Sequence, residues 1–421
     1  MRRVIIITLL FVLNLVSYGQ EKKAFGIKFS GFVKNDFFYD SRQTVTAREG
    51  HFLLWPSPEK LDELGNDINA KTNFNFLAIQ SRLKGSITGP DAFGAKTSGV
   101  IEADFFAQLN PNINLLRLRH AYVKLNWEHL EVLAGQTWNP LFVTVCFPGT
   151  VSFNTGTPLQ SFARNPQIRL TYNISGFKII GAALAQRDYA TWGIAGPSTS
   201  YLRNSSVPDL QLQLQYGSEK TESGFKYDVG GGIAYKTIVP RLESEMGPDN
   251  TIYKVNEKVS GLTAMGYAKI TTKPVTIKFQ ARYGENITDL LAISGFAVKE
   301  VTNSTSGERS YTPLRDITFW GEIHSNGKIQ FGLFGGITKS LGTKEAMSDP
   351  YNYVYGLGTN INSLFRISPR VIFNSGKVRI ALELEYTQAK YGNDYYDEYY
   401  KPESTTTVSN IRGLVAVYYF F

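Results

Sequence analysis

Apolar and polar residues alternate along most of this chain. In the clearest run, residues 210–216 (LQLQLQY), three leucines and a tyrosine are interleaved with three glutamines. The stretches 275–283 (VTIKFQARY) and 378–386 (VRIALELEY) have a similar pattern. A period of two residues is that of a β-strand, because successive side chains point to opposite faces of a sheet. Each stretch therefore predicts a strand with one apolar and one polar face.

Sixteen such segments run from one end of the chain to the other. A membrane-spanning β-barrel has this pattern, because it closes its sheet to satisfy every backbone hydrogen bond and alternates lipid-facing with interior side chains. An even strand number is the rule for a single-chain bacterial barrel. We therefore predict an all-β fold, a transmembrane antiparallel up-and-down barrel of about sixteen strands. The predicted strands are 25–39, 74–87, 99–109, 115–127, 130–138, 166–174, 177–187, 210–217, 225–236, 259–272, 275–284, 315–324, 328–338, 363–374, 377–387 and 408–421.

The connections between these segments alternate in length. Every second connection is short, and two of these, 325–327 (SNG) and 375–376 (SG), contain residues that adopt the positive φ of tight hairpins. Most of the others are long and polar. This alternation predicts short periplasmic turns and long extracellular loops. The long connections are 40–73, 139–165, 188–209, 237–258, 285–314, 339–362 and 388–407.

The N-terminus has the pattern of a secretory signal peptide, predicted over residues 1–19. Arg2 and Arg3 precede an apolar run from Val4 to Val16, which is too short to cross a bilayer. The run ends in 17–19 (SYG), with small residues at positions −3 and −1 of a cleavage site before Gln20. We therefore expect an exported protein that loses these residues.

Residues 20–421 are predicted to form a single barrel, since no linker or shift in composition divides them. The last strand alternates as far as Phe421, where the chain stops on an aromatic ring. Such an ending resembles the C-terminal signal that the barrel-assembly machinery reads. We therefore expect this machinery and outer-membrane lipid as partners, and the outer membrane of a Gram-negative bacterium as the location.

Charge indicates what the interior of the barrel attracts. The chain has a formal charge of +8 at pH 7, and the export signal argues against nucleic acid as its partner. If the apolar positions face lipid, the interior positions carry about two basic residues for each acidic one. Basic side chains around a constriction favour anions; the alternative is that these charges pair with each other and give little selectivity. The arginines predicted from these positions to line the pore are Arg82, Arg169, Arg282, Arg366, Arg370, Arg379 and Arg412.

Residues 116–122 (LRLRHAY) concentrate charge on one segment. Arg117 and Arg119 share a parity, and both are predicted to project into the interior. His120 then falls on the outward parity, where a lone imidazole facing lipid is unfavourable. We therefore expect His120 to lie against a neighbouring subunit or near a rim of the barrel.

The connection 139–165 differs from an ordinary surface loop. It is rich in proline, phenylalanine, threonine and glycine, and its one charged residue is Arg164. Two arrangements remain open. The segment folds inward and narrows the pore, or it lies over the mouth as a cap.

Four short motifs resemble those of the DcaP-like outer-membrane porins and their Bacteroidetes relatives. They are 116–123 (LRLRHAYV), 135–138 (GQTW), 147–156 (FPGTVSFNTG) and 165–172 (NPQIRLTY), in the order and spacing of that family. The resemblance implies a sixteen-stranded homotrimeric porin for small anionic solutes such as dicarboxylates. It also implies lining residues at the constriction, namely Arg117, Arg119, Arg164 and Arg169. Some members precede the barrel with a coiled coil; here the first strand follows the cleavage site closely, so we expect a trimer to rest on contacts of the barrel wall.

Two other classes of function are alternatives to a passive porin. A receptor or adhesin would bind a partner through its loops, and the tyrosine-rich stretch 391–400 with Asp394 is a candidate surface. An enzyme is not expected, since the four histidines stand in no catalytic motif. Cys146, the single cysteine, lacks a disulfide partner within the chain. We recognise no metal or cofactor motif, and expect neither group.

Overall fold

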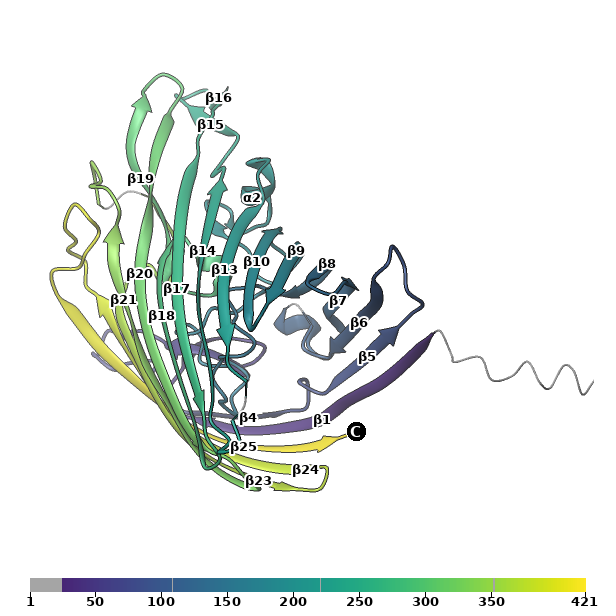
Figure 1. Ribbon diagram of the computed structural model, residues 1–421. Helices are drawn as coiled ribbons and strands as arrows, with labels where there is room; N and C mark the ends of the chain where they lie inside the picture. Colours follow the sequence, from purple (N-terminus) through teal and green to yellow (C-terminus); the bar gives the residue numbers. More distant parts are fainter. Residues whose placement is uncertain (1–24, 108, 220, 351–352) are drawn as a thin grey trace, which may run out of the picture.

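The computed structural model describes residues 25–107, 109–219, 221–350 and 353–421, which form one closed antiparallel barrel of sixteen strands (Figure 1). The predicted signal peptide, residues 1–19, lies outside the described residues. No helix in the described part is long and apolar enough to cross a membrane. The wall strands are β1 (Gly26–Asp40), β4 (Asn73–Leu77) continued by β5 (Arg82–Thr88), β6 (Lys96–Asp104), β7 (Arg117–Asn126), β8 (Leu130–Trp138), β9 (Arg164–Ile174), β10 (Phe177–Leu184), β13 (Asp209–Gly217), β14 (Lys226–Ile238), β17 (Val259–Thr271), β18 (Val275–Glu285), β20 (Glu308–Ser325), β21 (Ile329–Thr343), β23 (Ile361–Ser375), β24 (Val378–Gly392) and β25 (Thr405–Phe420).

The first and last strands close the barrel. β1 pairs with β25 in an unbroken antiparallel register from Phe32 opposite Phe420 to Asp40 opposite Arg412. On its other edge β1 pairs with β4 and then with β5, which together make one interrupted strand. Closure joins the two ends of the sheet, so that the backbone groups of Phe32–Asp40 pair with β25 and are not left facing lipid. The predicted fold class and strand number are therefore confirmed.

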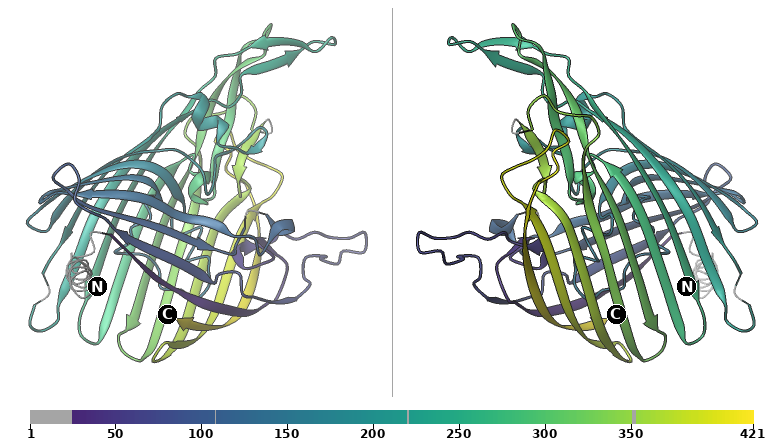
Figure 2. Two further views of the ribbon diagram at one scale, coloured as in Figure 1. Left: turned by 90° about the vertical axis from the view of Figure 1, so that its right-hand side faces the viewer. Right: turned by 90° about the vertical axis from the view of Figure 1, so that its left-hand side faces the viewer.

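The wall is not equally tall all round. The strands from β5 to β10 are 7–11 residues long, whereas β20 has 18 residues and β23 and β24 have 15 each. Figure 2 shows the long strands rising well above the short ones. The other elements belong to the loops: β2 (Thr44–Ala47), β3 (Phe52–Pro56), η1 (Asn110–Asn112), β11 (Trp192–Gly193), β12 (Gly196–Pro197), α2 (Ser200–Asn204), β15 (Glu243–Met246), β16 (Thr251–Lys254), η2 (Thr288–Leu290), β19 (Ser294–Asn303) and β22 (Val354–Leu357).

The two faces of the wall follow the alternation in the sequence. On β13, Leu212 and Leu214 are 47% and 56% exposed, whereas Gln211 and Gln213, which alternate with them, are buried. Apolar side chains exposed on the outer face are stable only where hydrocarbon surrounds them, and polar ones face the interior.

A β-bulge changes the orientation of His120. On β6, the consecutive residues Glu102 and Ala103 pair with His120 and Leu118 of β7, so Arg119 is an extra residue on the bulged strand. His120 therefore lies opposite the inward-facing Glu102, and its Nδ1 is 3.0 Å from the Thr137 hydroxyl oxygen. The expectation that His120 faces outward to a neighbouring subunit is wrong, because the parity count assumed a regular strand.

Three segments fold into the barrel and pack on one another. They are the β2–β3 hairpin, the connection 139–163 and the turn around η2. Their apolar side chains form one buried cluster, in which the rings of Phe106 and Phe153 stack with centroids 4.1 Å apart. Other large members of this cluster are Phe52, Trp55, Leu141, Phe142, Phe162, Leu290 and Ile293.

The outer face predicts an asymmetric response to charge on β13. Leu212→Arg should lower the free energy of unfolding by about 2–4 kcal/mol, because the guanidinium would enter hydrocarbon. Gln215→Arg, on the inward face of the same strand, should lower the free energy of unfolding far less. Urea titration of the protein folded into lipid vesicles measures both values. Equal losses would contradict the orientation of this strand.

Candidate functional site

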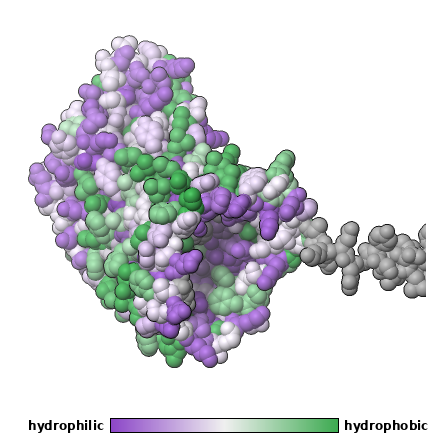
Figure 3. Space-filling model, viewed as in Figure 1, coloured by the Kyte–Doolittle hydropathy of each residue, from purple (hydrophilic) through white to green (hydrophobic). Residues whose placement is uncertain are grey.

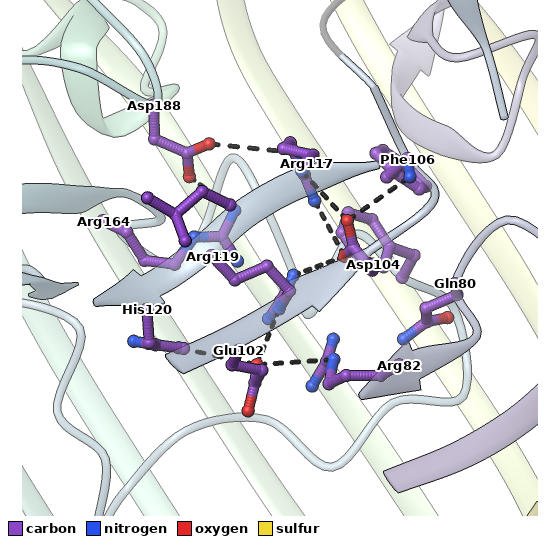
Figure 4. A network of polar contacts seen from close by, with 12 residues as sticks. Gln80, Arg82, Glu102, Asp104, Phe106, Arg117, Arg119, His120, Arg164 and Asp188 are labelled. Carbon is purple, nitrogen blue, oxygen red and sulfur yellow. Dashed lines mark hydrogen bonds and ion pairs between the residues drawn. The ribbon is translucent and has the colours of Figure 1, made fainter. Parts of the chain in front are cut away.

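A network of buried charges lies on the inner face of the short strands (Figure 4). Asp104 on β6 and Arg117 on β7 are opposite each other in the register, and the guanidinium donates to both carboxylate oxygens at 3.1 and 3.0 Å. The bulged Arg119 donates to Glu102 and to Asp104, both at 2.8 Å. A bidentate pair of this kind is strong and fixes the orientation of both groups.

The connection after β10 adds a third carboxylate. Asp188 lies 2.5 Å from Arg164 and 3.8 Å from Arg117, and its side chain is 4% exposed. Burial acts to raise the pKa of Asp188, but the Arg164 and Arg117 guanidinium groups outweigh it and hold that pKa below its usual range. Pattern analysis of the sequence did not find Asp188, because it stands in a loop where no alternation indicates a direction.

The network has more donors than its own acceptors use. Arg82 lies over the ring of Phe32, with its Nε 3.5 Å from Glu102. Within the described residues, Nε of Arg82 and Nε and Nη1 of Arg164 are buried without a hydrogen-bond partner. The network joins four arginines to three carboxylates, which leaves one positive charge in excess. Such an arrangement can accept an anionic group.

Other predicted lining arginines hold the inward segments. Arg366 is fully buried and donates to the carbonyl oxygens of Thr157 and Leu54, each at 2.6 Å. Arg412 pairs with the carboxylate of Asp40 at 2.6 Å and donates to the Gly50 carbonyl at 2.7 Å. These side chains therefore join the wall to the β2–β3 hairpin and to the connection 139–163.

Arg282 and Arg370 are arranged in the same way. Arg282 is 2.7 Å from Asp316 and donates to the Ser161 hydroxyl at 3.0 Å. Arg370 lies 3.1 Å from Glu322. Both arginines are buried, so here they contact protein rather than an open water column.

Two wall carboxylates bind the same segment through its backbone. Glu322 accepts a short hydrogen bond from the Gly149 N–H. Glu383 accepts from the N–H groups of Val151 at 2.5 Å and Ser152 at 3.3 Å. A backbone N–H group donates whatever the residue type, so the pattern of residues could not predict these contacts.

The remaining predicted arginines lie where the interior is more open. Arg379 stacks over the rings of Tyr418 and Phe420, and Arg169 is half-buried with its Nε unpartnered among the described residues. Both belong to a set of inward-facing basic residues near the short turns, for which the described residues contain no ion pair. Figure 3 looks into a hollow beside β1 and β5, with hydrophilic residues over much of its rim. The set is Lys28, Lys84, Arg169, Lys178, Lys269 and Arg379.

The described histidines stand beside acidic side chains. His51 is 2.8 Å from Asp36 inside the barrel, and His324 is 2.8 Å from Glu322. Burial outweighs the attraction of Asp36 and lowers the pKa of His51. In the described part of the chain, no group of three or more histidine, cysteine, aspartate or glutamate residues could hold a metal ion.

A polar pocket lies among the extracellular loops. It has a volume of about 530 Å³ and is lined by Tyr353, Tyr355, Tyr396, Tyr400 and Asp394, with other residues of the same loops. The rings of Tyr396 and Tyr400 stack with centroids 4.3 Å apart. The tyrosine-rich stretch 391–400 therefore contributes to a concave surface.

The chain is similar in structure to known outer-membrane channels. The channel DcaP of Acinetobacter baumannii shares 16% identity with it at a TM-score of 0.63, over 96% of this chain and 99% of that one. The anion-selective porin of Comamonas acidovorans shares 11% at 0.53, over 94% and 100%. A trimer form of OmpT from Vibrio cholerae shares 11% at 0.52, over 95% and 100%. No protein-family model and no curated protein matches the chain. At these identities the likeness shows the fold.

The inward position of the connection 139–163 predicts an unreactive thiol. The Cys146 side chain is fully buried, with Sγ 3.6 Å from the Ala268 carbonyl, and burial raises the thiol's pKa to about 11. At pH 8 a maleimide should leave the folded protein unlabelled and react fully after denaturation, as mass spectrometry would show. The exposed Leu242→Cys, in a Cys146→Ala background, should react at once. Rapid labelling of folded Cys146 would place this segment outside the barrel.

The Arg164–Asp188 pair predicts a pH-dependent stability. Asp188→Asn leaves a buried guanidinium unpaired. It should therefore lower the free energy of unfolding by about 3–5 kcal/mol at pH 7. Since the folded pKa of Asp188 is depressed, the wild-type advantage is present above the unfolded pKa and disappears as the pH falls through the folded value, below about pH 4. Urea titrations at several pH values measure it, with the exposed Asp249→Asn as control. A constant difference down to acid pH would contradict this assignment.

Proposed function

We propose that this chain is a porin of the Gram-negative outer membrane, which passes small hydrophilic and preferably anionic solutes by diffusion. The observation that carries the proposal is the closed barrel, apolar outside and charged within. A tube of this kind is stable only where hydrocarbon surrounds it and water enters it. The similarity to solved outer-membrane channels supports this reading.

The preference for anions rests on the balance of unpaired charge. Buried arginines and carboxylates largely neutralise each other, whereas the basic set near the short turns is joined to no carboxylate by an ion pair in the described part of the chain. This basic set forms a cationic vestibule, which raises the local concentration of anions. The partly exposed guanidinium of Arg82 would then bind the solute's carboxylate or phosphate at the constriction.

The inward segments set the width of the path in this proposal. The connection 139–163 is tied to opposite sides of the wall by Lys278, which donates to the Phe147 carbonyl at 2.9 Å, and by Lys34, which donates to the Val151 carbonyl at 3.2 Å. Such an anchored segment narrows the interior and limits solutes by size.

Export and assembly complete the proposal. Residues 1–19 would direct secretion and be removed, and the final strand ending in Phe421 would be read by the barrel-assembly machinery. We expect a homotrimer whose barrels contact each other through the wall. No cofactor and no catalytic step is part of this function.

A receptor is the second candidate, favoured by the pocket of four tyrosines beside Asp394. Its aromatic faces and carboxylate could bind a polar ligand from outside the cell. The two functions differ in one measurable respect, because a receptor without a path through its interior would carry no current.

Current recordings on the purified protein in planar bilayers test the porin. We expect steady ohmic channels that pass chloride in preference to potassium, as measured by the reversal potential in a salt gradient. Preference for potassium would contradict the anionic solute. Absence of any current would contradict the porin and favour the receptor.

A triple variant tests the cationic vestibule. Lys28, Lys84 and Arg169 replaced by Gln should lower the chloride-to-potassium permeability ratio by about twofold or more, because the local field falls. The matched control replaces the exposed loop residues Lys254, Lys258 and Lys401 by Gln, which removes the same charge. Equal effects of the two variants would show that net charge alone sets the selectivity.

A further inference from the structure

The extracellular connection between β3 and β4 forms a separate arm, residues 57–72. Figure 2 shows it leaving the barrel sideways, well beyond the wall. Every residue from 59 to 66 is exposed. Three large apolar side chains lie on this arm, Leu61 at 60%, Leu64 at 87% and Ile68 at 52% exposed.

The arm has a built structure of its own. Leu61 and Asp67 form a β-bridge, and the Asp62 carboxylate accepts the N–H groups of Leu64 at 2.9 Å and Asn66 at 2.8 Å. At its base, Arg42 pairs with Asp67 at 3.0 Å. These bonds hold the arm in one conformation and present its leucines to the outside. A preorganised apolar tip is favourable when a second surface covers it.

A groove on the outside of the wall fits such a tip. It lies across the outer ends of β8, β9 and β10 beside α2, and has a volume of about 570 Å³. Its lining is mainly apolar, and the basic Arg203 belongs to it. Arg187, next to the lining residue Gln186, is exposed as well. The main apolar lining residues are Ala134, Ile168, Ala183, Leu202, Val207 and Pro208.

The charges of the two surfaces are complementary. Glu59, Asp62 and Glu63 flank the apolar residues of the arm, and hydrogen bonds from Asn66 hold the pKa of Asp62 below its usual range. With Lys60 and Lys71 counted against its four carboxylates, the arm still carries a net negative charge, opposite in sign to the arginines at the groove. These carboxylates also disfavour hydrocarbon as the cover for the tip, because lipid would have to desolvate them.

The positions of the two surfaces indicate how copies would join. The arm leaves the wall between β1 and β4, whereas the groove lies on β8 to β10, with β5, β6 and β7 between them in the wall. The surfaces thus lie on two flanks of the short-stranded side. A contact between different surfaces is heterologous, and it builds a closed ring when the rotation between copies closes.

We propose that the arm of one copy docks in the outer groove of a second copy, so that the short-stranded walls of the ring face each other. This inference rests on the oligomer of the proposed function and names the surfaces that would form it. The acidic, leucine-bearing arm inserts, and the arginine-rimmed groove of the second copy accepts it.

Disulfide cross-linking tests the contact. In a Cys146→Ala background, the double variant Leu64→Cys with Val207→Cys should form disulfide-linked dimers and higher oligomers when it is oxidised in the membrane. Two singly substituted proteins, refolded together, should give linked dimers only. The matched control pairs Leu64→Cys with Leu242→Cys, another exposed leucine, at 57%. Failure of the first pair to link, or equal linking in the control, would overturn the proposal.

A second variant measures the apolar tip directly. Leu64→Glu should shift the detergent-solubilised protein from oligomer to monomer in light scattering, whereas Leu242→Glu should not. An oligomer unchanged by Leu64→Glu would overturn the docking. Conductance of the same samples separates the two proposals. Channels without cross-links contradict the docking alone, and cross-links without channels contradict the porin alone.

Discussion

The need to satisfy every backbone hydrogen bond away from water governs this structure. An open sheet in a bilayer leaves an edge of bare N–H and C=O groups, each of which costs several kcal/mol. The pairing of β1 with β25 removes that edge. Once the sheet is closed, one face of each strand must meet hydrocarbon and the other the interior, so the alternation of residues follows from the closure.

The charged side chains of the interior are subject to a similar constraint. Charged side chains that leave water must find partners. In this barrel they find them in each other, as in Arg117 with Asp104, and in the backbone of inward segments, as in Arg366 with the carbonyl of Thr157. The outcome is an interior divided between an anchored loop core and a vestibule with basic side chains. Both parts bear on how a solute would pass.

Much of the fold could be predicted from the sequence, because alternation and turn chemistry are local signals. The strand 210–217 and its neighbours appear in the structure within a few residues of their predicted ends. Among the candidate residues, Arg117 and Arg119 do point inward. His120 does not follow its parity, since a single extra residue in a bulge turns the side chains that follow it. Asp188 and Glu383 gained their roles from groups distant in the chain.

The sequence by itself determined the period of two, the number of strands and the face that each regular side chain presents. These depend on neighbouring residues and on the surrounding solvent. Only the tertiary structure decided which charges meet, how the inward segments are anchored and where the arm points. Those outcomes depend on strand register, on a bulge in β7 and on contacts between residues such as Arg366 and Leu54, which stand more than three hundred positions apart. Alternation along one strand carries no information about them.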